Sequence, residues 1–219
     1  MKNSHALVLG ATGATGQELV KLLLEDSNYD NVSIFVRREV NLQHEKLKIH
    51  VIDFSKLSEY KDLVKGDVLF SALGTTLNNA GSKDKQYLVD YTYQYEFAKM
   101  ASENGVNTYS LVSSLGANEN SLFFYPKIKG KLEESVKLLD FKTTQIYQPP
   151  SLIRQPELMR SGEKIAVNLF RKISSFGILK SLKPMPVDVL ASKMVNDSQT
   201  NQNERLTIYK PVDIFKQHK

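Results

Sequence analysis

The sequence predicts an α/β protein built on a doubly wound parallel sheet of six to seven strands, with helices on both faces. Three observations lead to this class. Short apolar and β-branched runs alternate with helix-length connections along most of the chain. A glycine-rich turn joins the first of these runs to a helix. The chain of 219 residues has room for one full α/β core, whereas a second independent domain would be cramped.

The predicted elements follow one another in a regular order. Strands are expected where β-branched and aromatic residues gather, at residues 5–9, 32–36, 47–52, 67–71, 107–112 and 143–147. Helices are expected from the glycines to about residue 25, over 83–103 with Asn104-Gly105 as its stop, and over 126–139. A polar loop is expected over residues 78–82.

The pattern loosens after Ser151. We expect one domain over residues 1–219, with its core in 1–150 and a small C-terminal segment, 151–219, on the substrate side. Within that segment the sequence predicts helices near 156–172 and 187–196 and a strand at 206–209. Open α/β folds bind ligands at the carboxyl ends of their strands, so this segment is the expected source of substrate selectivity.

Composition excludes several classes of site. The chain has no cysteine, and therefore no disulfide framework and no thiolate metal site or nucleophile. The four histidines, His5, His44, His50 and His218, are scattered without metal-ligand spacing, so no metal site is expected. The formal net charge of +5 is typical of a solvated lysine-rich surface. No zinc-finger or RNA-recognition pattern indicates nucleic-acid binding.

The start of the chain and its apolar runs bear on location. Met-Lys-Asn-Ser lacks the apolar centre of a secretory signal peptide. No apolar run approaches the roughly 20 residues of a membrane span. From these observations we expect a cytoplasmic protein without a membrane anchor.

The glycine-rich turn is the strongest functional signal. Glycines let the backbone turn tightly and approach a ligand, and the following helix start offers N–H donors and partial positive charge to a pyrophosphate. The alternative is a strand–helix turn without a ligand, because a glycine motif by itself is a weak signal. The candidate cofactor-binding residues here are Gly10, Thr12, Gly13, Ala14, Thr15 and Gly16.

Two arginines end the second predicted strand, where a dinucleotide site holds the adenosine ribose. An NAD site places an acidic residue there, whereas this chain has Arg37 and Arg38, with Glu39 after them. A guanidinium pairs well with the additional phosphate of NADP, which a carboxylate would repel. The sequence therefore favours NADP(H), and the alternative is a pair of surface arginines.

Two further strand ends supply candidate cofactor contacts. Asp53 can accept from the adenine amino group with Phe54 packed nearby, or else Asp53 caps the next helix. Small residues after the fourth strand suit a backbone that passes under the cofactor, although they also suit any tight exit from a strand. These residues are Ser71, Ala72, Leu73 and Gly74.

Tyr125 and Lys129 are the candidate reactive pair. Residues four apart meet on one helix face, and a nearby ammonium favours the tyrosine's ionised form, which makes the tyrosine a usable proton donor to a carbonyl. The same spacing joins Tyr95 to Lys99, but Tyr95 lies in the middle of a long helix and is expected to serve packing. Tyr125 opens the helix after the fifth strand, close to Ser113-Ser114, where a serine can polarise the same carbonyl.

These motifs occur together with further short stretches: Val36-Arg37-Arg38, Ser71 to Thr76, Val112 to Ala117, Lys129-Gly130 and Gln148 to Ser151. In this combination the chain resembles the short-chain dehydrogenases/reductases, specifically the atypical branch with a GATGxxG-type loop and its small Tat-interacting-protein-like NADP-binding reductases. The resemblance implies a Rossmann fold and NADP(H). It also implies a triad of Ser114, Tyr125 and Lys129, with Ser113 as the other possible serine, Lys129 as ribose ligand and Pro150 near the nicotinamide. Residues from Met185 to Ala191 look like the start of a late helix beside the substrate cleft.

Two features depart from that family pattern. Gln148-Pro149-Pro150 stands where the branch usually has Arg-Pro-Gly. Pro126 follows Tyr125 and is expected to push Tyr125 out of helical dihedrals and onto the helix cap.

Two functions are open at this stage. The first is an NADP(H)-dependent oxidoreductase acting on a small carbonyl or quinone-like substrate, and the second is a non-catalytic NADP(H)-binding sensor. The helices over 83–103 and 126–139 could pair in a homodimer.

Overall fold

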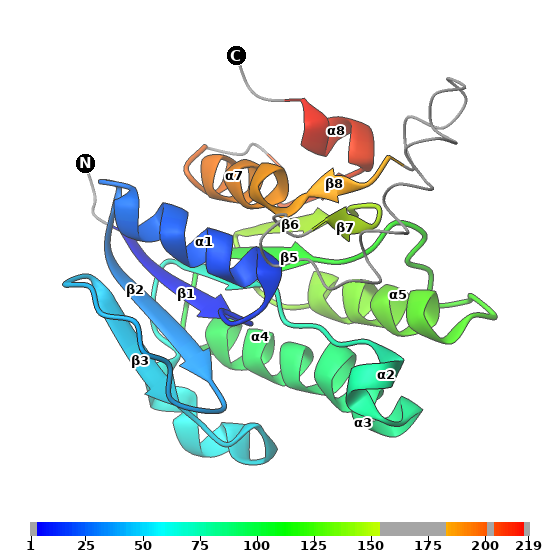
Figure 1. Cartoon of the computed structure of the whole chain (residues 1–219), viewed down its shortest axis with the longest axis horizontal. Coiled ribbons are helices and arrows are strands. Elements are labelled where there is room, and N and C mark those ends of the chain that lie inside the picture. The colour runs from blue at the N-terminus through cyan, green and yellow to red at the C-terminus, as the bar shows by residue number, and fades with distance from the viewer. Residues whose placement is uncertain (1–3, 154–182, 201–203, 217–219) are drawn as a thin grey trace.

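A seven-stranded parallel sheet forms the centre of the molecule (Figure 1). The computed structural model describes residues 4–153, 183–200 and 204–216. The strand order is β3-β2-β1-β4-β5-β6-β9, which confirms the predicted doubly wound Rossmann arrangement. The strands are β1 (Ser4–Leu9), β2 (Tyr29–Val36), β3 (Leu47–Val51), β4 (Val68–Ser71), β5 (Thr108–Val112), β6 (Thr143–Tyr147) and β9 (Leu206–Tyr209).

Helices cover both faces of this sheet, with α1 and α7 on one face and α4 and α5 on the other (Figure 1). The α-helices are α1 (Ala14–Glu25), α2 (Leu77–Ala80), α3 (Lys83–Tyr87), α4 (Tyr93–Glu103), α5 (Phe124–Lys137), α7 (Val187–Ser198) and α8 (Pro211–Phe215). A 3₁₀ segment, η1 (Phe54–Leu63), follows β3, and a π-helical segment, η2 (Leu88–Thr92), joins α3 to α4. Two short strands, β7 (Leu152–Ile153) and β8 (Met185–Pro186), pair with each other.

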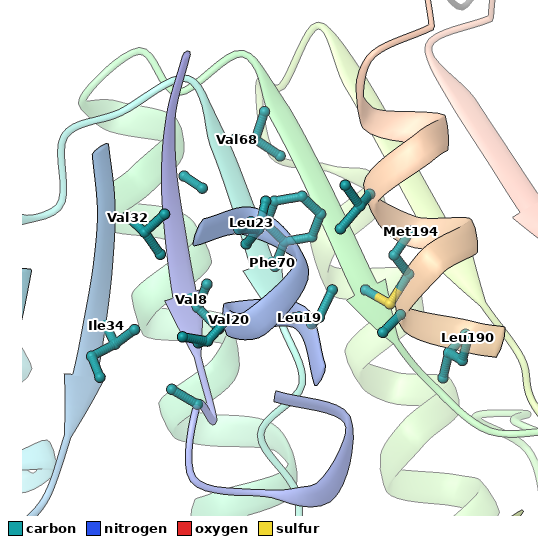
Figure 2. Close-up of a cluster of buried hydrophobic side chains, with 14 of the residues drawn as sticks. Val8, Leu19, Val20, Leu23, Val32, Ile34, Val68, Phe70, Leu190 and Met194 are labelled. Carbon is teal, nitrogen blue, oxygen red and sulfur yellow. The ribbon is translucent and has the colours of Figure 1, made fainter. Parts of the chain in front are cut away.

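Each face of the sheet has its own core because neighbouring strand residues point to opposite sides. On the α1 and α7 side, Val8 and Phe70 pack with Met194 of α7 (Figure 2). On the α4 and α5 side, Leu7 packs with residues that include Phe97. With both faces covered, the central strands are buried over long runs, namely the last four residues of β1 and all of β4, as expected for a parallel sheet.

The strand order reverses at β1, which has β2 on one side and β4 on the other. At such a switch point the chain leaves neighbouring strands in opposite directions, and a crevice opens at their carboxyl ends. The glycine turn follows β1, and Ser71 ends β4. Both sets of candidate cofactor residues therefore meet at this crevice.

The expectation for Tyr125 was wrong. Helix α5 begins at Phe124, after Phe123 as N-cap (φ −86°, ψ 134°), so Tyr125 is helical and does not lie on the cap. Pro126 is the third residue of the helix. The N–H groups of the first turn have no partner within the helix, so a proline there costs no helical hydrogen bond.

Other boundaries differ in smaller ways. The predicted loop over 78–82 contains the short helix α2, because the Thr76 hydroxyl accepts from Asn79 N at 3.3 Å and caps it. The predicted helix over 83–103 is divided into α3, η2 and α4. The late helix and strand are confirmed as α7 and β9, whereas the helix predicted near 156–172 lies outside the described residues. No described helix is both long and apolar enough to cross a membrane.

Candidate functional site

The glycine turn packs directly against the end of β4. Gly10 has φ +87°, and a Cβ there would lie 2.5 Å from Leu73 N and 2.6 Å from the Ala72 carbonyl carbon. A Cβ on Gly16 would overlap the Gly10 carbonyl and lie 2.8 Å from Ala11 Cα. A side chain at Gly10 would push the turn away from the end of β4, and a side chain at Gly16 would push α1 away from the turn. The glycines therefore bring backbone, and no side chain, to the crevice.

The start of α1 presents its N–H groups outward. Gly13 is the N-cap, no described side chain caps this end, and the first turn holds no acidic residue. Thr12 and Gly13 are exposed, Ala14 is half-buried, and Thr15 is buried. An uncapped helix start with its partial positive charge fits an anionic group such as a pyrophosphate.

Arg37 and Arg38 follow β2 beside this helix start. Strand β2 pairs with β1 up to Leu9 and Phe35, so its end adjoins the glycine turn. Both arginines are exposed, and neither has a carboxylate partner in the described part of the chain. Two exposed guanidinium groups that form no ion pair with a described residue could bind a phosphate on the ribose.

Asp53 caps the helical segment that follows it. Its Oδ1 accepts from Ser55 N at 2.9 Å and from Ser55 Oγ at 2.7 Å, and these two hydrogen bonds hold the pKa of Asp53 below its usual value. Phe54 is buried, with its ring centroid 5.5 Å from that of Tyr93. The capping interpretation is therefore confirmed, while an adenine contact stays a prediction.

The last residue of β4 and the residues that follow it have different roles. Ser71 is fully buried, and its hydroxyl donates to Gln94 Oε1 at 3.0 Å, so this side chain serves the contact with α4. Ala72 and Leu73 supply the backbone that meets Gly10. A Cβ on Gly74 would lie 3.2 Å from Asp90 Oδ1, which places Gly74 against η2.

A cavity of about 500 Å³ lies at the carboxyl ends of β5 and β6. It brings together two members of the expected triad, Ser114 and Tyr125, and also Pro150. Tyr125 is partly exposed, with 38% of its surface accessible, and it lines this cavity. The described residues that line it are Ser113, Ser114, Leu115, Tyr125, Pro149, Pro150, Ser151 and Leu152.

Close packing at Gly130 holds these residues together. A Cβ on Gly130 would lie 2.6 Å from Asn118 Cα, and Asn118 N donates to the Pro126 carbonyl at 3.0 Å. The loop after β5 is thereby pressed against the first turns of α5. As a result Ser114, at the end of β5, faces the same cavity as Tyr125.

The two neighbouring serines have different surroundings. Ser113 is buried, and its hydroxyl donates to Glu133, which also accepts from Gln148 Nε2 at 2.9 Å. Lys210 in turn donates to Gln148 Oε1. Ser114 is half-buried, and its hydroxyl makes a long 3.4 Å contact with the Leu115 carbonyl. Both serines line the cavity, but the Ser113 hydroxyl is bound to Glu133, whereas that of Ser114 has only this long contact among the described residues.

Lys129 lies behind the cavity. It is 3% exposed, and its Nζ donates to the Val112 carbonyl at 3.3 Å and lies 3.9 Å from Asp90 Oδ1. Lys129 does not line the cavity that the described residues form. The structure thus brings Ser114 and Tyr125 together and places Lys129 beside the end of β5.

Sequence reasoning missed Glu133 and Asp90. Each is one acidic residue among many in helical segments, and no motif marks it. Both are almost completely buried, which is rare for acidic residues unless they are paired, and each has polar partners in the fold. By contrast, the expectation that Tyr95 serves packing is confirmed, because its ring stacks on that of Tyr91 at 5.9 Å. The described residues hold no cluster of three or more side chains that could bind a metal ion.

Comparisons with known proteins agree with this geometry. Residues 10–139 match the model of a family described as NAD(P)H-binding. Protein FMP52 of Debaryomyces hansenii is 37% identical over 169 residues, which cover 76% of this chain and 74% of that protein. Protein HTATIP2 of Rattus norvegicus is 34% identical over 174 residues, which cover 78% of this chain and 72% of that protein.

Solved structures share the fold at low sequence identity. WbmH of Bordetella bronchiseptica, in complex with NAD+, superposes with a TM-score of 0.71 at 12% identity and covers 94% of this chain and 75% of its own. A UDP-N-acetylglucosamine 4-epimerase from Methanobrevibacter ruminantium has a TM-score of 0.68 at 15% identity, covering 96% and 77%. At such identities the likeness shows the fold alone.

One expectation is overturned by the relatives. FMP52 of Debaryomyces hansenii, Candida albicans and Kluyveromyces lactis is in each case named a mitochondrial protein, which contradicts the cytoplasmic location expected from the sequence. The reason is that the polar start argued only against a secretory signal. Mitochondrial targeting segments are amphipathic and lack the apolar centre of a signal peptide, so such a start does not decide the compartment.

Proposed function

The chain belongs to the NAD(P)H-binding family, in the atypical branch of the short-chain dehydrogenases/reductases, and on this premise we propose that it is an NADP(H)-dependent oxidoreductase of small carbonyl or quinone-like compounds. The observation that carries the proposal is the shared cavity of Ser114 and Tyr125. This cavity lies at the same edge of the sheet as the glycine turn, so a dinucleotide held at the turn can extend toward it.

The choice of NADP(H) rests on the arginines after β2. Arg37 and Arg38 offer fixed positive charge where the adenosine ribose of a dinucleotide lies, and the described residues give them no carboxylate to neutralise it. Burial does not weaken this charge, since both side chains are exposed. The expected contact is an ion pair with the 2′-phosphate, which NADH lacks.

The residues around the cavity have distinct proposed roles. When bound, the nicotinamide supplies the hydride. The Ser114 hydroxyl donates a hydrogen bond to the substrate oxygen and orients the carbonyl. The Tyr125 hydroxyl gives its proton to that oxygen as the negative charge develops. Lys129 adds a buried positive charge beside the end of β5, where it can also hold a ribose hydroxyl.

The proposed function is tested by NADPH oxidation across a panel of carbonyl compounds and quinones. We expect turnover with wild type and a loss of at least about a hundredfold in Tyr125→Phe, because general acid catalysis contributes on that scale. Phenylalanine keeps the ring and removes only the hydroxyl. Equal turnover by both proteins would exclude Tyr125 as the acid.

A second candidate is a non-catalytic NADP(H) sensor, and one feature favours it. Pro150, which stands where the usual Arg-Pro-Gly has its glycine, is buried next to Pro149 in the wall of the cavity. Rigid rings at this point narrow the ways in which a substrate can lie beside the nicotinamide. The sensor would bind NADPH in calorimetry and oxidise it with no compound of the panel, whereas turnover with any of them would contradict this candidate.

A further inference from the structure

A buried aspartate on η2 lies between the loop after β4 and Lys129. We propose that Asp90 is a positioning residue, whose carboxylate fixes the Lys129 ammonium at the end of β5 and couples it to the loop Gly74–Thr75. The inference rests on the proposed NADP(H) binding, since its functional consequence is the placement of Lys129 for the cofactor. Nothing in the sequence motifs marks Asp90.

Asp90 and Lys129 lie close together and are both shielded from water. Asp90 is fully buried, and Lys129 is 3% exposed. Asp90 Oδ1 lies 3.9 Å from Lys129 Nζ and accepts a hydrogen bond from Thr75 N at 3.3 Å. Isolated buried charges are costly, so a lysine in this position needs a counter-charge. Asp90 is the carboxylate that provides it.

The local backbone turns Asp90 inward. Residues Leu88–Thr92 form a π-helical segment between two α-helices, and such segments are rare and frequent at functional sites. Gln94 holds this segment in place, since its Nε2 donates to the Asp90 carbonyl at 3.0 Å and its Oε1 accepts from Ser71. The segment is thereby fixed to the end of β4.

The same carboxylate reaches the cofactor side of the crevice. A Cβ on Gly74 would lie 3.2 Å from Asp90 Oδ1, so glycine at this position permits the close approach. Gln86 of α3 donates from Nε2 to the Thr75 carbonyl at 3.3 Å and holds the loop against α3, which continues into η2. The backbone just before it, at Ala72 and Leu73, contacts Gly10 of the glycine turn. One side chain therefore joins the nucleotide end of the site to Lys129.

Asp90 is also incompletely satisfied, unlike an aspartate that serves packing. Its Oδ2 makes no hydrogen bond within the described part of the chain. Burial raises the pKa of Asp90, and the Lys129 ammonium opposes that rise. Asp197, which is equally buried, has Lys193 Nζ at 2.6 Å on one oxygen and the Tyr147 hydroxyl at 2.8 Å on the other. A buried carboxylate with an unsatisfied oxygen costs stability, and such exceptions gather at functional sites.

The experiment compares four variants of the full chain: Asp90→Asn, Lys129→Met, the double variant, and Asp197→Asn as matched control. NADPH affinity is measured by calorimetry and the thermal midpoint without cofactor by circular dichroism. We expect Asp90→Asn to weaken NADPH binding by roughly tenfold, about as much as Lys129→Met, and the double variant to bind no more weakly than either. Asp197→Asn should lower the midpoint and keep its NADPH affinity within about twofold.

Three results would overturn the inference. The first is wild-type NADPH affinity in Asp90→Asn, and the second is an effect that adds in full to that of Lys129→Met. If Asp90→Asn does not fold, the NADPH affinity of the double variant is compared with that of Lys129→Met. The third contradicting result is a weaker affinity in the double variant than in Lys129→Met. A wild-type protein that binds no NADPH would contradict the proposed function instead. The thermal midpoints of the single and double variants would then show whether Asp90 and Lys129 are coupled. Independent residues lower the midpoint additively, whereas coupled residues do not.

Discussion

The glycine turn after β1 and the cavity beside α5 lie at the same edge of the sheet, yet different kinds of contact hold them. At the turn, backbone meets backbone, and side chains at Gly10 or Gly16 would overlap neighbouring atoms. At the cavity, side chains from β5, α5 and β6 meet, as in the buried cluster of Ser113, Glu133 and Gln148. The glycine turn depends on the absence of side chains at Gly10 and Gly16. The cavity depends on the packing of side chains that lie far apart in the sequence.

The difference explains why one region is easier to recognise in a sequence. Seven consecutive residues contain the whole glycine turn, and glycine is a residue whose position has a direct steric meaning. The cavity is assembled from three segments that the chain brings together only after folding. Its chemistry therefore depends on tertiary contacts that no short motif records. The following changes test this contrast, beginning with the largest expected effect.

Gly16→Val should break the nucleotide end. The new Cβ would overlap the Gly10 carbonyl, which cannot move without displacing the turn from β4. We expect a loss of about 3 kcal/mol or more in the free energy of unfolding and no measurable NADPH binding. Urea denaturation and calorimetry measure the two effects.

Gly105→Ala is the control for this change. Gly105 has φ +79° but no atom within 4 Å of its Cβ position, so only backbone strain of about 1 kcal/mol is expected. Equal losses in the two variants would show that close packing at Gly16 is not what matters.

Gly130→Ala should affect the reactive end and spare the nucleotide end. Its Cβ would lie 2.6 Å from Asn118 Cα, which forces the loop after β5 away from α5 and separates Ser114 from Tyr125. We expect about 2 kcal/mol lower stability and reduced turnover, with NADPH affinity close to that of wild type. Lys131→Ala, one residue further and exposed, is the control. A variant that keeps full turnover would contradict the role given to this contact.

Exchanging the two serines separates packing from chemistry. Ser113→Ala removes the hydroxyl that donates to buried Glu133, and should lower the free energy of unfolding by about 1 kcal/mol. Ser114→Ala should leave stability nearly unchanged and lower the rate of NADPH oxidation. Denaturation and turnover are measured on both variants. The assignment of Ser114 fails if Ser113→Ala loses turnover more severely at equal stability.

The smallest predicted effect is a pH dependence that arises from two histidines outside the site, His5 on β1 and His50 on β3. Burial, followed by the charge of Lys48, lowers the pKa of His5 and His50 below 6.5. The unfolded chain therefore binds more protons than the folded chain below pH 6.5, so this contribution to stability is present above that pH and is lost as the pH falls.

Because both rings are partly exposed, we expect a change below about 1 kcal/mol between pH 7.5 and 5.5. Denaturant midpoints across this range measure it, with the variant His5→Gln/His50→Gln as control. The control should show a shallower pH dependence, and an identical slope in both proteins would exclude the two histidines as its source.

Much of the fold could be predicted because each strand is a short run rich in β-branched, aromatic or other apolar residues that lies between polar turns. The exact helix boundaries could not. Thr76 creates helix α2 in a stretch that looks like a polar loop, and Pro126 is tolerated inside α5 because first-turn N–H groups need no helical partner. The π-helical turn at η2 likewise leaves no signature in residue periodicity.

The candidate site was predictable in part for a related reason. The sequence favours Ser114 and Tyr125, and the fold brings both into one cavity. The sequence alone could not decide whether Ser113 or Ser114 is the reactive serine. That distinction comes from Glu133, which lies twenty residues away from Ser113 in the chain. Asp90 is hidden in the same way, because its partners Thr75 and Lys129 belong to other segments.

The central claim is that the nucleotide end of this site selects NADP(H), and one calorimetric experiment tests it most directly. Wild type and Arg37→Ala are titrated with NADPH and with NADH. We predict that wild type prefers NADPH and that Arg37→Ala loses about 2 kcal/mol of NADPH binding while its NADH affinity is unchanged, since one charge-assisted phosphate contact is removed. Equal weakening of both cofactors, or a wild-type preference for NADH, would contradict the claim.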